Sequence, residues 1–71
     1  MAQVKVRGGS FVSYLHPETG AALAESGMLF TGWHPVADVV PSQGYTRVVV
    51  KTDNKTRHAD IPDSRIEGYQ K

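Results

Sequence analysis

Cysteine is absent from the chain, and its absence rules out two common ways of stabilising a small protein. Neither a disulfide-stapled scaffold nor a zinc site built on thiolates is available. The 71 residues suffice for one domain, which we expect to span residues 1–71. Only 39% of the residues are hydrophobic. So small a core gains stability when the domain docks on a neighbouring molecule.

Long apolar runs are missing as well. The first residues lack the apolar segment of roughly 7–15 residues that defines a signal peptide. No segment approaches the ~20 apolar residues that cross a bilayer. We therefore expect a protein of the cytoplasm or of a virion, not one secreted through a signal peptide and not a membrane protein.

The chain also lacks an excess of charge of either sign, since 8 basic residues against 7 acidic ones give a net charge of +1. Four basic residues and one aromatic nevertheless fall in a short stretch: Tyr45, Arg47, Lys51, Lys55 and Arg57. Small β-barrels bind single-stranded nucleic acid with such groups, so the hairpin 47–57 is an alternative binding site. Against this, Asp53 and Asp60 lie within the same stretch, and we expect Asp60 to engage Arg47.

No recognisable catalytic or metal-binding constellation occurs. His16, His34 and His58 are not at the spacings of paired metal ligands. The serines are not in a Gly-x-Ser-x-Gly elbow, and Gly8-Gly9 does not match a phosphate-binding loop. We expect a non-enzymatic protein without a cofactor or a metal.

Glycine and proline interrupt the chain every few residues, and short β-branched or aromatic runs lie between them. This pattern predicts several short strands. Residues 3–7 and 10–16 are strand candidates on either side of Gly8-Gly9, where a bend or bulge is expected. Residues 17–20 suit a tight turn, and residues 28–33 form a further strand that His34-Pro35 should end. Residues 36–44 are expected to be a connection with room for one short strand.

Residues 21–26 leave two interpretations open, because their composition suits a helix while their length is under two turns. We favour a strand returning from the turn. The predicted fold is all-β, a small antiparallel barrel or sandwich of SH3-like or OB-like size. The alternative is an α+β fold with one short helix near residues 18–26.

Residues 45–61 give the strongest local prediction, a hairpin that turns at Asp53-Asn54. A two-residue loop fixes the register. It pairs Val50 with Arg57, Val48 with Ala59 and Thr46 with Ile61 on one face. The other face pairs Lys51 with Thr56, Val49 with His58 and Arg47 with Asp60.

The remaining apolar and aromatic residues point to protein contacts. We select six interface candidates on their apolar character and strand position: Val4, Val6, Trp33, Val49, Ile66 and Tyr69. Segments 1–7 and 62–71 are expected to act as arms that reach onto neighbouring molecules.

In composition the chain resembles the accessory or decoration proteins of virus particles, those of bacteriophages above all. That resemblance implies a non-catalytic structural or assembly module in a homo- or hetero-oligomer. An inhibitor that docks on a host protein is a further alternative.

Overall fold

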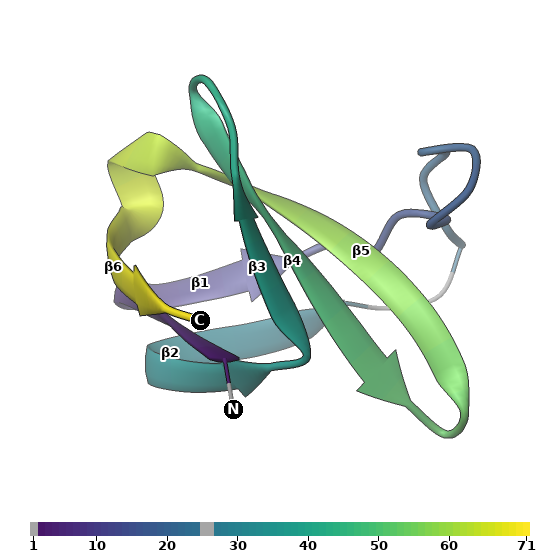
Figure 1. Ribbon diagram of the computed structural model, residues 1–71, viewed down its shortest axis with the longest axis horizontal. Coiled ribbons are helices and arrows are strands. Elements are labelled where there is room, and N and C mark those ends of the chain that lie inside the picture. Colours follow the sequence, from purple (N-terminus) through teal and green to yellow (C-terminus); the bar gives the residue numbers. More distant parts are fainter. Residues whose placement is uncertain (1, 25–26) are drawn as a thin grey trace.

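The computed structural model describes residues 2–24 and 27–71, and almost all of its regular structure is β-strand. The elements, in chain order, are β1 (Ala2–Val12), β2 (Met28–Val36), β3 (Asp38–Pro41), β4 (Tyr45–Thr52), β5 (Lys55–Pro62), the 3₁₀ turn η1 (Asp63–Arg65) and β6 (Ile66–Gln70). The strands form two antiparallel sheets with the orders β2-β1-β6 and β3-β4-β5. In Figure 1 the second sheet crosses in front of β1 and β2. The all-β prediction is confirmed. Within the described ranges, strand pairing does not close the two sheets into a barrel.

The core lies between the two sheets and is built by alternation along the strands. In β1 the side chains of Ala2, Val4 and Val6 are buried, while the residues between them are not. In β4 the same alternation buries Val48 and Val50. Because successive side chains on a strand point to opposite faces, each sheet has one face in the core and one outer face.

The hairpin of β4 and β5 has the predicted register at every pair. Asp53 and Asn54 form the turn with φ angles of 50° and 63°. Two consecutive left-handed residues are the geometry of a type I′ turn, which matches the twist of the flanking strands. The local sequence was therefore sufficient to predict this hairpin.

The first sheet departs from prediction at two places. Residues 2–12 form one continuous strand, β1, with an irregular register between Lys5 and Gly9. Gly8, with a φ of 59°, supplies the predicted bulge. The expected strand 10–16 ends at Val12.

Pro35 does not end β2, contrary to prediction. The strand runs on to Val36, and Pro35 lies opposite Gln3 of β1. The physical reason is that β2 is the edge of its sheet, where a residue without a backbone N–H leaves no ladder bond unmade.

The turn at residues 17–20 is confirmed. The amide of Gly20 donates to the carbonyl oxygen of His16 at 2.8 Å, and Gly20 has a φ of 74°. Residues 18–24 are turn and isolated bridge, so the alternative of a helix near residues 18–26 is wrong for that part. The returning strand is reduced to a single bridge between Leu15 and Ala22. Residues 25 and 26 lie outside the described part of the chain.

Segments 1–7 and 62–71, which we expect to act as arms, contribute strands to the first sheet where the structure describes them. Residues 2–7 lie in β1, the central strand of its sheet, and residues 62–71 run from the end of β5 through η1 into β6. The two segments pair with each other, with Gln3 opposite Gln70 and Val4 opposite Tyr69. The amide groups of Gln3 and Gln70 add a hydrogen bond of 2.7 Å. Among the described residues β1 pairs on both of its edges, whereas β6 is an edge strand that pairs with β1 alone.

Candidate protein interface

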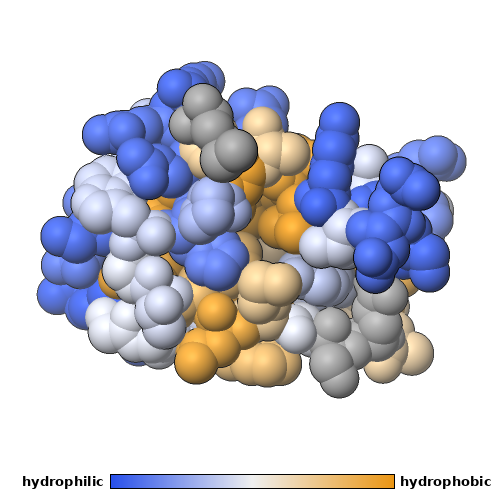
Figure 2. All heavy atoms as spheres, turned by 90° about the horizontal axis from the view of Figure 1, so that it is seen from below, coloured by the Kyte–Doolittle hydropathy of each residue, from blue (hydrophilic) through white to orange (hydrophobic). Residues whose placement is uncertain are grey.

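The outer face of the β2-β1-β6 sheet exposes large apolar side chains, and we define it by Lys5, Phe11, Leu29, Thr31 and Trp33. Phe11 is 66% exposed and Leu29 55% exposed, and they are direct partners across β1 and β2. Trp33 is 45% exposed and follows Leu29 on the same side of β2. Figure 2 shows hydrophobic residues as an orange and tan band across the underside of the molecule, with hydrophilic residues on both sides. Contiguous exposed apolar surface of this kind typically marks a contact site.

Glycines let the apolar side chains lie flat on this face. A Cβ on Gly9 would lie 3.5 Å from Cδ1 of Leu29, which places the Leu29 side chain over the Gly9 backbone. A Cβ on Gly68 would lie 3.5 Å from Cη2 of Trp33. An added Cβ would only reach ordinary contact distance, so the leucine and tryptophan side chains lie close over the two glycines while much of their surface remains exposed.

The six predicted interface residues divide among different environments. Val4 and Val6 have exposed fractions of 0% and 1%, so their assignment to an interface is corrected: they are core residues. Ile66 is half-buried and packs against the core. These three side chains were selected because they are apolar. An apolar side chain is equally expected in the core of the domain itself.

The other three predicted residues do not form one surface. Trp33 lies on the outer face as defined. Tyr69 is 45% exposed but lies opposite Val4, at the rim of the core side of its sheet. Val49 is half-buried on the second sheet between Asp38 and His58.

Sequence reasoning missed Phe11 and Leu29, the most exposed of the large apolar residues. A usable pattern was present. Phe30 lies in the core, so alternation directs its neighbour Leu29 outward, and Leu29 then fixes Phe11 through the strand register. That register depends on the bulge at Gly8, and the sequence does not give its size.

The basic residues of the hairpin are not collected into one surface. Arg47 is held by Asp60 through Nε to Oδ1 at 2.7 Å and Nη2 to Oδ2 at 3.0 Å, as predicted. This hydrogen bonding raises the pKa of the Arg47 guanidinium. Arg57 lies opposite Val50 and so projects from the face opposite to that of Lys51. Lys51 and Lys55 are exposed near the tip of the hairpin.

Tyr45 is engaged within the hairpin as well. Its ring lies 6.0 Å from Cζ of Arg47, at the limit of a cation–π contact. Of the five nucleic-acid candidates, the two lysines at the tip therefore present the most accessible charge.

The three histidines occupy separate places. His34 stacks on Phe30 with ring centroids 3.9 Å apart and an interplanar angle of 9°. Burial lowers the pKa of His34. Nδ1 of His16 accepts a hydrogen bond from the amide of Glu18 at 3.2 Å in the 17–20 turn. Among residues 2–24 and 27–71, no three histidine or carboxylate side chains are grouped so that they could hold a metal ion.

Comparison with known proteins gives no match to a family model, a curated protein or a solved structure. The described residues contain no helix with the length and apolar character needed to span a membrane.

Proposed function

We propose that the chain is a non-catalytic structural module whose outer face docks on a second copy of the same chain within a larger assembly. The observation that carries the proposal is the pairing of Phe11 with Leu29 in direct register, with Trp33 on the same face. These three side chains expose about half of their surface or more, and their neighbours on the face form no cover over them.

The energy of burying this face favours weak association. Covering the exposed parts of Phe11, Leu29 and Trp33 contributes roughly 1–2 kcal/mol for each side chain, since complete burial is worth about 1.5–3. Both copies contribute, which gives roughly 6–12 kcal/mol for the pair. Association costs about 4–15 kcal/mol in lost freedom. The most favourable difference between the two ranges is about 8 kcal/mol, which corresponds to a micromolar dissociation constant, so a single pair is expected to form at micromolar concentration or above.

Charge supports a second copy as the occupant. A net charge of +1 produces little repulsion between identical molecules. Lys5 is the single charged member of the outer face, and it is half-buried between its strand neighbours. Hydrophobic contact between copies therefore meets little electrostatic opposition.

Composition supports the class of assembly that we propose. A small cysteine-free β domain without a catalytic motif resembles the accessory proteins of virus and bacteriophage particles, in which many copies act by contact alone. We propose a role of this class, with the module occupying a fixed position through the outer face.

Sedimentation velocity across micromolar to millimolar concentrations tests the proposal. The native chain should associate in a concentration-dependent way, and Leu29→Glu should remove that association by placing a charge in the contact. Val40→Glu is the matched control, since Val40 is 46% exposed on the second sheet.

Two outcomes contradict the proposal. One is a native chain that stays monomeric at every concentration. The other is a monomer that binds a single-stranded oligonucleotide and loses that binding in Lys51→Glu, which would favour the nucleic-acid alternative.

A further inference from the structure

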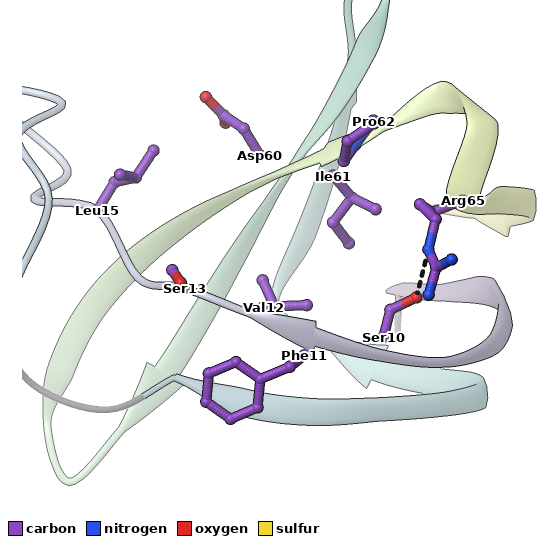
Figure 3. A pocket seen from close by; sticks show the side chains of 9 residues that line it. All are labelled: Ser10, Phe11, Val12, Ser13, Leu15, Asp60, Ile61, Pro62 and Arg65. Atoms are coloured by element: carbon purple, nitrogen blue, oxygen red, sulfur yellow. Dashed lines mark hydrogen bonds between the residues drawn. The ribbon is translucent and has the colours of Figure 1, made fainter.

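A groove of about 520 Å³ opens where β1 separates from β5. Figure 3 shows Val12 and Ile61 pointing toward each other across its floor, while the Phe11 ring points to the other side of β1. Val12 and Ile61 are almost completely buried. We call the gap between residues 10–13, at the end of β1 and just past it, and residues 60–62 of β5 the seam.

The backbone of β1 directs polar groups into the seam. At one end, the amide of Leu15 donates to the His58 carbonyl oxygen at 2.7 Å, and the amide of His58 donates back to Leu15 at 3.1 Å. At the other end, the carbonyl oxygen of Gly9 accepts a bond of 3.1 Å from Nη2 of Arg65. Backbone groups alternate between the two edges of a strand. Alternation along β1 therefore directs the N–H and C=O groups of Phe11 into the seam. We infer the same direction for Ser13, which lies just past β1 and midway between Phe11 and Leu15.

The backbone of β5 presents the opposite wall. His58 directs both polar groups to Leu15 and away from β4, so Asp60, two residues further on, faces the seam as well. A continued ladder would pair Ser13 with Asp60 and Phe11 with Pro62. Neither pair forms in the described ranges. Pro62 has no N–H to donate, which removes one bond from the ladder that would close the seam.

The side chains at the seam favour a negatively charged occupant. The carboxylate of Asp60 is neutralised by Arg47 on the outer surface of the hairpin. Arg65 spans the far end of the seam, with Nε donating to Oγ of Ser10 at 3.2 Å, as drawn in Figure 3. The guanidinium is exposed and has further N–H groups to offer.

We propose that the seam binds a short extended segment of a partner protein by strand addition. The segment pairs its backbone with Phe11 and Ser13, carries β-branched residues that favour an extended chain, and directs a carboxylate to Arg65. Residues 10–13 span ~13 Å at the rise of a strand, so about four residues of the segment are held. Strand addition obtains affinity from main-chain bonds and selectivity from alternate side chains. The inference rests on the proposed function in taking the chain to act by protein contact, but it concerns a different surface.

Amide hydrogen exchange followed by ¹⁵N-resolved NMR tests whether the seam binds an extended segment. In the free protein, the amides of Phe11, Ser13 and Asp60 should exchange faster than those of Val12 and Ile61. The probe is a blocked peptide, acetyl-Thr-Val-Thr-Val-Glu-amide. On its addition, exchange at Phe11 and Ser13 should slow at least tenfold. The same peptide with N-methylated valines should have no effect.

Matched variants separate the contributions. Ser13→Pro removes one donor from the wall and should weaken peptide binding, whereas Ser13→Ala keeps the donor and should not. Arg65→Gln should abolish the preference for the glutamate peptide over its glutamine analogue. The exchange measurement needs no variant, so an unfolded Ser13→Pro protein would leave the test intact.

The inference is overturned if Phe11 and Ser13 are already protected in the free protein, which would mean a closed ladder. It is also overturned if the peptide shifts no resonance at millimolar concentration, or only those at the hairpin tip. Leu29→Glu should bind the peptide like the native chain. Self-association without peptide binding would therefore contradict only the proposal that the seam binds a segment. Peptide binding without self-association would contradict only the proposal that the outer face docks on a second copy.

Discussion

The Trp33 indole reaches across the first sheet to the open side of Gly68. They lie on β2 and β6, on opposite sides of β1, and both are register partners of Lys5. Because Gly68 has no side chain, the indole extends over β1 until Cη2 lies 3.5 Å from the position of a Gly68 Cβ. The flat apolar surface of the outer face depends on this arrangement.

Substitution of Gly68 tests this contact. Gly68→Ala should preserve the indole position, since a Cβ fits at an ordinary contact distance. It should raise the free energy of unfolding by about 0.4–1 kcal/mol, because alanine reduces the freedom of the unfolded chain. Gly68→Leu should displace the indole outward. Acrylamide quenching of the only tryptophan measures this directly, and equal quenching in both variants would show that Trp33 does not rest on Gly68.

The turn of the β4–β5 hairpin gives a stability prediction. Asn54 has a φ of 63°, a conformation that glycine adopts without cost. Asn54→Gly should leave stability unchanged or raise it, and Asn54→Val should lower it by about 1–2 kcal/mol because its branched Cβ clashes in the left-handed region. Urea denaturation followed by circular dichroism measures both. An Asn54→Val protein as stable as the native chain would be inconsistent with a type I′ turn.

His34 should make stability depend on pH. Burial lowers its pKa below 6.5 in the folded protein, so between the folded pKa and 6.5 the unfolded chain binds more protons. Stability therefore falls as the pH falls below about 6.5, and the loss is complete below the folded pKa. His34→Phe keeps a ring against Phe30 and removes the titration.

The measurement is the difference in unfolding free energy between the native chain and His34→Phe across the pH range. It should be constant above about 6.5 and should shift against the native chain below that value. A pH-independent difference would show that His34 is not held neutral by its surroundings.

The features that local sequence determines were predictable. The register of residues 45–61 followed from a two-residue turn and from alternation, and the structure has each predicted pair. The pairing of Arg47 with Asp60 followed from that register. Both depend on residues that are near one another in the chain.

The features set by distant residues were not predictable. Segment 62–71 has the composition of a loose tail, and only its pairing with residues 3–6 makes part of it a strand. Pro35 is tolerated because β2 lies at a sheet edge, a fact of topology. For the same reason Val4 and Val6 could not be assigned to the core instead of an interface until both sheets were known.

The most direct test of the account is a concentration series that follows the indole N–H resonance of Trp33 by NMR. The chain has one tryptophan, so the resonance is unambiguous and reports on the outer face. We predict that it shifts progressively from micromolar to millimolar concentration in the native chain and in Val40→Glu, and stays fixed in Leu29→Glu. A resonance that stays fixed in the native chain, while the amides of Lys51 and Lys55 respond to an oligonucleotide, would contradict the account.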